Sequence, residues 1–332
     1  MSRVSVERIT VSAYTIPTDR KPESDGTAVW DSTTLVLVEI DAGGKRGTGW
    51  TYESAAAATL IRDQLADVVR GENVLDTRAV WQKLTGAVRN PGRSGIASYA
   101  IAALDIALWD LRARLQETAL CDLMGVAREA VPIYGSGGFT SYDIPVLQKQ
   151  LGAWAAAGMP AVKMKVGRDH AADVARVAAA RDAIGPACRL FVDGNDGYAV
   201  EEAIRIARRF AEYDVTWFEQ PVDHNDLVGM RRMREHAPPG MAIASGEYIT
   251  DTSRAALVAD AVDVLQADAS RCGGYTGFLA IDGYCEVVRK PLSSHCGPML
   301  HLHVAAASLR LRNLEYFHDH VRIERMLFDG FI

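Results

Sequence analysis

The sequence predicts a closed barrel of alternating strands and helices, preceded by a smaller α+β domain. From Val131 onward, eight short apolar runs alternate with segments of helical periodicity, as expected for a parallel sheet. Seven of these runs carry a charged residue at or near the C-terminal end, at intervals of 20 to 28 residues. No GxGxxG or GxxxxGK motif follows a run, which disfavours an open nucleotide-binding sheet. We therefore expect a (β/α) barrel with its site at the strand ends.

The first 125 residues contain strands followed by helices. Alternation over residues 4–11, a second run at residues 33–40 and a third at 47–52 predict an antiparallel meander. Helices are expected from Ser54 to about Leu115. The last of them has one apolar stripe, formed by Ile101, Leu104, Leu108 and Leu111. The polar segment 17–26 is interpreted either as a mobile lid or as an exposed loop.

Residues 126–332 are expected to form the barrel. Its helices are amphipathic, with an apolar face for the sheet and a charged face for solvent. The expected strands cover residues 131–135, 161–166, 189–194, 216–219, 241–246, 262–267, 291–295 and 314–317.

Composition restricts the class of protein. The chain has 332 residues, of which 48% are hydrophobic and 23% charged, as in ordinary globular proteins. Its net charge of -6 argues against a nucleic-acid partner. It has neither an eighteen-residue apolar run nor the apolar core of a signal peptide, so no membrane association is expected. Five cysteines without CxxC spacing suggest reduced thiols in the cytoplasm.

Polar side chains at the strand ends predict a site on the barrel axis. Because side chains alternate along a strand, Lys163 and Lys165 share the inward face. The same alternation directs polar groups of the later strands inward. These are Asp193 with Asn195, then Glu219, Glu247, Asp268, His295 and Glu315. The carboxylates of Asp193, Glu219 and Glu247 form an all-oxygen set that suits Mg²⁺.

This set of groups suits removal of a proton next to a carboxylate. Mg²⁺ would act as a Lewis acid that stabilises the resulting enediolate. We expect Lys165 to be the base, with its pKa lowered by repulsion from Lys163 and the cation. Asp268 beside His295 is expected to orient the imidazole.

Seven motifs in order resemble the mandelate racemase subgroup of the enolase superfamily. They are VKMK at 162–165, VDGN at 192–195, FEQP at 218–221, GE at 246–247, QADASRCGG at 266–274, SH at 294–295 and LE at 314–315. The resemblance implies a modified (β/α)7β TIM-type barrel, with residues 1–125 as its capping domain. After Glu315 the C-terminal tail is shorter than is usual in that family, where it returns to the capping domain.

The resemblance also implies a role for each polar group. Lys165 and the His295 and Asp268 dyad would be acid/base catalysts on opposite faces of the substrate, as in enolase-superfamily sites generally. Lys163 would bind the substrate carboxylate and tune Lys165. The remaining groups would hold one Mg²⁺ ion or contact the substrate. The ligands would be Asp193, Glu219 and Glu247, and the substrate contacts Glu315 and Asn195.

The favoured reaction is dehydration of a sugar acid to a 2-keto-3-deoxy acid. Racemisation or epimerisation of an α-hydroxy acid is equally compatible with two opposed bases. A muconate-lactonising or dipeptide-epimerase role would require lysine in place of Asp268. A Schiff-base aldolase using Lys163 or Lys165 and a non-catalytic barrel are the remaining alternatives. The expected partner is a small carboxylate, and the expected assembly a homo-oligomer.

Overall fold

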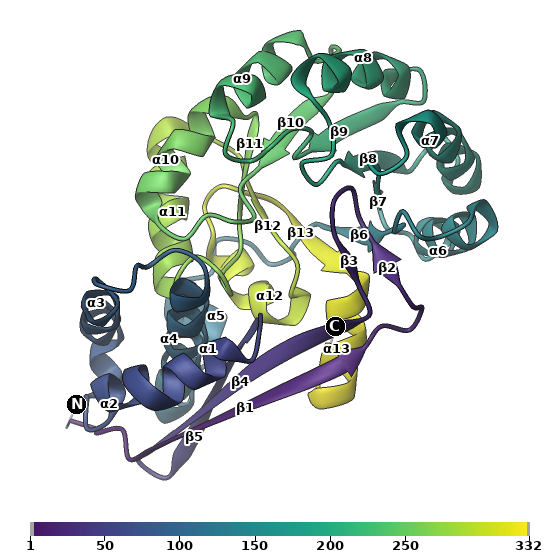
Figure 1. Ribbon diagram of the computed structural model, residues 1–332. Helices are drawn as coiled ribbons and strands as arrows, with labels where there is room; N and C mark the ends of the chain where they lie inside the picture. The colour runs from purple at the N-terminus through teal and green to yellow at the C-terminus, as the bar shows by residue number, and fades with distance from the viewer. Residues whose placement is uncertain (1–2, 331–332) are drawn as a thin grey trace.

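The computed structural model describes residues 3–330. The four residues that complete the two expected domains, Met1, Ser2, Phe331 and Ile332, lie outside the described residues. Figure 1 shows a strand-rich N-terminal part in purple and blue, beside a ring of strands and helices coloured from teal to yellow. The predicted class of fold, a closed parallel barrel preceded by an α+β part, is confirmed.

A three-stranded antiparallel sheet of order β1-β4-β5 forms the N-terminal part. Its strands are β1 (Arg8–Pro17), β4 (Ser32–Ala42) and β5 (Lys45–Tyr52). The predicted meander is therefore present, but its first strand begins later than expected. Val4 and Val6 lie before β1, because their backbone groups bond instead to the chain between residues 71 and 74.

Helices follow this sheet. They are α1 (Ala56–Leu60), the π-helical η1 (Ile61–Leu65), α2 (Ala66–Val69), the 3₁₀ turn η2 (Val74–Asp76), α3 (Thr77–Ala87), α4 (Ile96–Leu115) and α5 (Leu120–Met124). One apolar stripe was expected on α4, but this helix is buried around most of its circumference, so the prediction was too narrow. It packs on β5 and also on the barrel helix α11 (Gly274–Val288), where Trp109 Nε1 donates a hydrogen bond of 3.0 Å to Thr276 Oγ1.

Two glycines allow α4 to lie directly on β5. A Cβ atom at Gly47 would lie 2.3 Å from the carbonyl oxygen of Ala107. A Cβ atom at Gly49 would lie 2.4 Å from the carbonyl oxygen of Ala103. Both distances are far below van der Waals contact, so glycine is required for this approach.

Eight parallel strands close into the barrel, and β13 pairs with β6 to complete it. The strands are β6 (Ile133–Gly137), β7 (Ala161–Lys165), β8 (Arg189–Asp193), β9 (Val215–Glu219), β10 (Ala242–Ser245), β11 (Val264–Ala267), β12 (Leu292–Ser294) and β13 (Leu311–Phe317). The intervening helices are α6 (Ile144–Ala156), α7 (His170–Ile184), α8 (Val200–Ala211), α9 (Leu227–His236), α10 (Thr252–Ala261), α11 and α12 (Pro298–Ala307). Each strand overlaps one of the eight predicted runs, although β6 ends two residues after its run and β13 begins three residues before its own.

The segment between β1 and β4, residues 18–31, packs on the mouth of the barrel. It contains a short antiparallel ribbon of β2 (Glu23–Ser24) and β3 (Val29–Trp30). A Cβ atom on Gly26 would lie 2.0 Å from the carbonyl oxygen of Gly194, just beyond β8. The segment therefore packs on the ends of barrel strands (Figure 1) with Glu23 and Ser24 buried, while most of its other residues are exposed.

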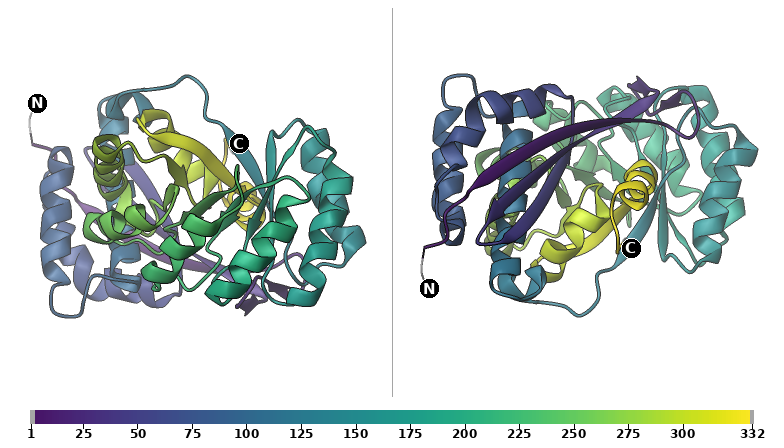
Figure 2. Two further views of the ribbon diagram at one scale, coloured as in Figure 1. Left: turned by 90° about the horizontal axis from the view of Figure 1, so that it is seen from above. Right: turned by 90° about the horizontal axis from the view of Figure 1, so that it is seen from below.

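The C-terminal helix α13 (His318–Leu327) returns to the N-terminal sheet. Tyr52 OH donates a hydrogen bond of 3.2 Å to Glu324 Oε1. The rings of Trp50 and Phe328 stack with centroids 4.4 Å apart. Figure 2 shows this helix beside the strands that cross the lower side of the barrel. The short segment after Glu315 thus contacts the N-terminal part.

Two further expectations concern the chain as a whole. Between residues 3 and 330, no helix is both long enough and apolar enough to cross a membrane. All five cysteines are free thiols, as their number and spacing suggested.

Candidate active site

The polar side chains predicted at the strand ends meet at the C-terminal mouth of the barrel. Lys163 and Lys165 lie two residues apart on β7 and both face inward. The strand register pairs Lys165 with Asp193 of β8, and Asp193 with Glu219 of β9. All four residues are buried, with at most 5% of their surface exposed. Adjacent strands therefore place two ammonium groups against two carboxylates.

Lys163 is surrounded by three carboxylates. Its Nζ lies 2.5 Å from Glu219 Oε1, 2.8 Å from Glu315 Oε1 and 3.4 Å from Asp193 Oδ2. Burial lowers the pKa of Lys163, but these neighbours reverse the effect and raise it well above its usual value. Lys163 is thus a fixed positive charge at the centre of the site.

The expected lowering of the Lys165 pKa relied on Lys163 and a bound cation together, and Lys163 alone does not produce it. Lys165 Nζ lies 2.6 Å from Asp193 Oδ2. Burial and repulsion from Lys163 lower the pKa of Lys165, but the Asp193 carboxylate outweighs them and raises it. Spacing along the chain identified the neighbouring lysine but not the closer carboxylate. We expect Lys165 to become a neutral amine when a cation competes with it for the Asp193 carboxylate.

The pair of Asp193 and Glu219 fits a divalent cation. Burial, together with the charge of Asp193, raises the pKa of Glu219 to about 8. The two carboxylates therefore repel each other on neighbouring strands. A hard cation relieves such repulsion, and carboxylate oxygens are the ligands that Mg²⁺ prefers.

Glu247, the third predicted ligand, contacts a different partner. It follows β10 by two residues, and its Oε2 lies 2.7 Å from His295 Nε2. A cation bound by all three predicted carboxylates would therefore take Glu247 from His295 and Asp193 from Lys165. Lys165 and His295 would thus each lose a carboxylate partner when such a cation binds.

His295 lies between two carboxylates. Its Nδ1 is 2.9 Å from Asp268 Oδ2, on the side opposite the contact with Glu247. Burial lowers the pKa of His295, but Cys296, Glu247 and Asp268 raise it well above its usual value. Ser270 fixes Asp268, since its backbone N and its Oγ each donate a hydrogen bond of 2.7 Å to Oδ1. Asp268 can therefore hold the imidazole in one orientation.

Glu315 connects the lysine side of the site to the histidine side. Its Oε1 lies 2.8 Å from Lys163 Nζ, and its Oε2 lies 4.0 Å from His295 Nε2. The backbone N of Cys296 also donates a hydrogen bond of 2.8 Å to Oε2. Glu315 is fully buried and faces the barrel interior.

Asn195 lies where the segment 18–31 meets the site. Its backbone N donates a hydrogen bond of 3.0 Å to Asp193 Oδ1, and its carbonyl oxygen accepts one of 3.0 Å from Thr27 Oγ1. The side-chain Oδ1 is buried and has no hydrogen-bond partner among the described residues. Leaving a buried acceptor unpaired is costly, so this oxygen is available to a ligand.

Family models match most of the chain. Residues 146–332 match the enolase C-terminal domain-like model, and residues 8–125 match the mandelate racemase / muconate lactonizing enzyme N-terminal domain. The chain belongs to the mandelate racemase / muconate lactonizing enzyme family. The resemblance drawn from seven sequence motifs is confirmed.

Three relatives illustrate how fully the chain shares this family's architecture. The structure of a mandelate racemase/muconate lactonizing enzyme-like protein from Rubrobacter xylanophilus has a TM-score of 0.97 and 49% identity, over 99% of this chain and 91% of that one. A 3,6-anhydro-α-L-galactonate cycloisomerase from Streptomyces coelicolor is 34% identical over 91% of this chain and 85% of its own. The L-talarate/galactarate dehydratase from Salmonella typhimurium, liganded with Mg and L-lyxarohydroxamate, has a TM-score of 0.87 and 30% identity, over 95% of this chain and 84% of that one.

Two side chains at the site of this family member were not anticipated from the sequence. The guanidinium of Arg271 lies 5.2 Å from the ring centroid of Tyr248 and 5.8 Å from that of Tyr99. The ring of Tyr134 on β6 has its centroid 5.5 Å from Lys163 Nζ. The inward direction of Tyr134 could have been deduced from strand alternation. The position of Arg271 depends on a turn that the sequence pattern does not specify.

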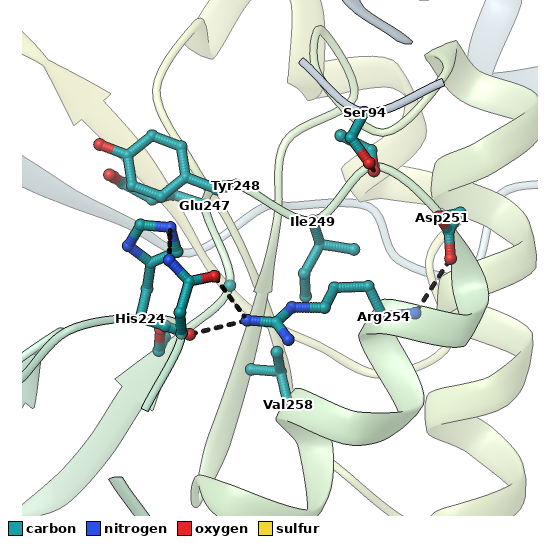
Figure 3. Close-up of a pocket in the computed structure, with 12 residues that line it drawn as sticks. Ser94, His224, Glu247, Tyr248, Ile249, Asp251, Arg254 and Val258 are labelled. Atoms are coloured by element: carbon teal, nitrogen blue, oxygen red, sulfur yellow. Dashed lines mark hydrogen bonds between the residues drawn. The ribbon is translucent and has the colours of Figure 1, made fainter. Parts of the chain in front are cut away.

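A cavity of about 260 Å³ opens beside Glu247 (Figure 3). Of the described residues that line it, Glu247 alone belongs to the predicted site. Arg254 crosses the cavity and donates hydrogen bonds of 2.9 Å to the His224 carbonyl and 3.3 Å to Asn225 Oδ1. Tyr248, next to Glu247, lies over the His224 ring at 4.7 Å between centroids. The cavity reaches the candidate site from the β10 side.

Proposed function

We propose that the chain is a Mg²⁺-dependent enzyme that removes the proton next to the carboxylate of a sugar acid. The observation that carries this proposal is a continuous network of buried charged groups with an amine at one end and an imidazole at the other. It runs from Lys165 through Asp193, Lys163 and Glu315 to His295. The magnesium bound in a dehydratase relative supports the choice of cation.

The proton-carrying groups are proposed to act from the two ends of this network. When Mg²⁺ is bound by Asp193, Glu219 and Glu247, it supplies a Lewis acid for the substrate carboxylate. Lys165, freed from Asp193, is proposed to exchange a proton at Nζ. His295 is proposed to exchange one at Nε2 while Asp268 holds Nδ1.

Other residues are proposed to position the substrate. Lys163 provides a permanent positive charge for a carboxylate oxygen, because its pKa is held high by its neighbours. Glu315 is proposed to hydrogen-bond the enediolate that forms when the proton is removed. The unpaired Oδ1 of Asn195 is proposed to accept a hydrogen bond from a substrate hydroxyl.

Dehydration is the outcome we favour. The base takes the α-proton, the β-hydroxyl departs as water with a proton from the opposite acid, and the resulting enol becomes a 2-keto-3-deoxy acid. Two other outcomes follow from the same first step. A substrate without a β-leaving group would be reprotonated to give an epimer. The cycloisomerase relative supports a third, in which a ring oxygen of an anhydro sugar acid is the leaving group.

A substrate screen tests this proposal. Mono- and diacid sugars, including anhydro acids, would be incubated with the protein and Mg²⁺, and 2-keto acid formation would be followed. Exchange of the α-proton in D₂O, measured by NMR, would detect racemisation that leaves no new product. Turnover or exchange supports the proposal. Failure of every acid in both assays would contradict it.

Three broader expectations are also retained as proposals. The domain limits are set at residues 1–125 and 126–332, with one Mg²⁺ site in the second. A homo-oligomeric state is proposed, and light scattering of the purified protein would test it. The five free thiols support a cytoplasmic location.

A further inference from the structure

A second group of possible cation ligands lies where the segment 18–31 meets the end of β13. Asp19 and Glu23 come from that segment, and His318 and Asp319 are the first residues of α13. One ligand atom from each of the four lies within 4.8 Å of those of the other three. We call these four residues the junction cluster, because they join the N-terminal part to the barrel.

Two carboxylates of the junction cluster are buried with an unsatisfied oxygen. Glu23 and Asp319 are both 0% exposed. Tyr142 OH donates a hydrogen bond of 3.1 Å to Glu23 Oε1, and Trp30 Nε1 donates one of 3.2 Å to Asp319 Oδ2. Glu23 Oε2 and Asp319 Oδ1 have no partner among the described residues. Buried acceptors are rarely left unpaired, so either a proton shared between the two carboxyl groups or a bound cation joins these oxygens.

The charges of the junction cluster favour a cation. Its three carboxylates have one ion-pair partner within the cluster, since His318 Nε2 lies 2.9 Å from Asp19 Oδ2. Two of these carboxylates, Glu23 and Asp319, are fully buried beside each other, where their negative charges repel. The cluster thus resists a further negative charge, and a bound cation would remove that penalty.

The ligand types suit a transition-metal ion. Zinc binds carboxylate oxygen and imidazole nitrogen at about 2.0 to 2.2 Å, so it would draw together the four donors, which lie within 4.8 Å of one another, to at most about 4.4 Å. An imidazole among carboxylates favours zinc over magnesium. Asp19 and His318 also line a cavity of about 620 Å³, which gives a route from solvent.

We infer that the junction cluster binds a second divalent cation of the zinc type, which fastens the segment 18–31 over the mouth of the barrel. The segment is already in place against the site, because Thr27 Oγ1 donates to the carbonyl of Asn195 and Ser24 Oγ lies 2.7 Å from Thr140 Oγ1. This inference is independent of the reaction catalysed, since it concerns a separate set of ligands.

Zinc binding by the full-length protein tests the inference. Equilibrium dialysis with Zn²⁺, followed by metal analysis, would compare the wild type with Glu23→Gln and His318→Asn. Each variant is expected to lose one equivalent of zinc or at least ten-fold in affinity. Asp31→Asn is the matched control, because this exposed residue of the same segment loses the same charge outside the cluster. The difference in zinc binding between the wild type and the two variants should persist when Asp193→Asn is added to each protein. That substitution alters the carboxylates of the barrel site and leaves the junction cluster unchanged.

Proteolysis locates the effect on the segment. Zn²⁺ is expected to slow trypsin cleavage after the exposed Arg20 at least several-fold in the wild type and in Asp31→Asn, but not in Glu23→Gln. Equal zinc stoichiometry and affinity in the wild type, Glu23→Gln and His318→Asn would overturn the inference. Because His318 is only partly buried, its variant provides a second test if Glu23→Gln does not fold.

Discussion

At the scale of single residues, the proposed function depends on which neighbouring group each charged side chain contacts. Lys165 Nζ is 2.6 Å from Asp193, and His295 Nε2 is 2.7 Å from Glu247. Each proposed proton carrier is therefore paired with a proposed Mg²⁺ ligand. Under the proposed mechanism, cation binding and proton transfer would be coupled, because the cation would compete with Lys165 and His295 for the same carboxylate oxygens.

Lys165→Ala tests the proposed base. It is expected to lower kcat at least about 10²-fold, since a positioned general base contributes about 10² to 10⁴. The measurement is the rate of 2-keto acid formation on the best acid from the substrate screen. Lys149→Ala, an exposed lysine of α6, is the matched control and should keep the wild-type rate. Equal rates for both variants would exclude Lys165 as a proton carrier.

At the scale of elements, helix α4 decides how the two parts of the chain fit together. It lies on β5 on one side and on α11 on the other. Asp105 of α4 accepts hydrogen bonds from Thr276 of α11, at 2.9 Å from the backbone N and 2.7 Å from Oγ1. Substitutions on β5 should therefore disturb the interface with the barrel as well.

Gly49→Ala tests the close contact between β5 and α4. The added Cβ would lie 2.4 Å from the Ala103 carbonyl, so the free energy of unfolding is expected to fall by about 1 to 3 kcal/mol. Urea unfolding measures the change. Gly86→Ala, in α3 with open space around it, is the control and should raise stability by about 0.5 to 1 kcal/mol. An unchanged midpoint for Gly49→Ala would show that α4 can move away without cost.

Glu324 of α13 predicts a pH dependence of stability. Burial raises its pKa to about 8, although the hydrogen bonds from Met299 and Tyr52 oppose this. A carboxyl group whose pKa is raised on folding contributes fully to stability at pH values below its pKa in the unfolded chain. For Glu324 that contribution is lost as the pH rises from about 4.5, the pKa in the unfolded chain, to about 8, the pKa in the folded protein.

Glu324→Gln should remove this dependence while keeping an oxygen acceptor for Tyr52. The variant is expected to be more stable than the wild type by about 1 to 3 kcal/mol at pH 9, with a smaller or reversed difference at pH 5. Urea unfolding at both pH values measures it. Glu129→Gln, at an exposed position, should follow the wild type. A constant difference at both pH values would argue against titration of Glu324 in this range.

At the scale of the whole molecule, Mg²⁺ should stabilise the folded barrel. Binding at a free concentration of one hundred times Kd adds about 2.7 kcal/mol to the free energy of unfolding. Asp193→Asn is expected to abolish the shift, because it removes a carboxylate shared by Lys165 and the proposed ligand set. Thermal unfolding with Mg²⁺ and with EDTA measures the effect, and the exposed Asp63→Asn is the control. The same shift in Asp193→Asn would place the cation elsewhere.

Much of the whole fold was predictable because its signals are local and repeated. Each barrel strand is a short apolar run followed by an amphipathic helix, and side-chain alternation fixes the inward face. Lys163, Lys165, Asp193 and Glu219 therefore appear where alternation placed them. The course of α4 was less predictable, because its second buried face is created by contact with a helix that follows more than 150 residues later.

By itself, the sequence determined the barrel, its order of strands, the inward polar groups and the family. The tertiary structure alone decided the partners: the Asp193 carboxylate has a larger effect on the pKa of Lys165 than Lys163 has, and Glu247 lies against His295. It also decided that the segment 18–31 covers the barrel mouth. The physical reason is that alternation fixes the direction of a side chain, whereas charge interactions depend on distances across the closed barrel.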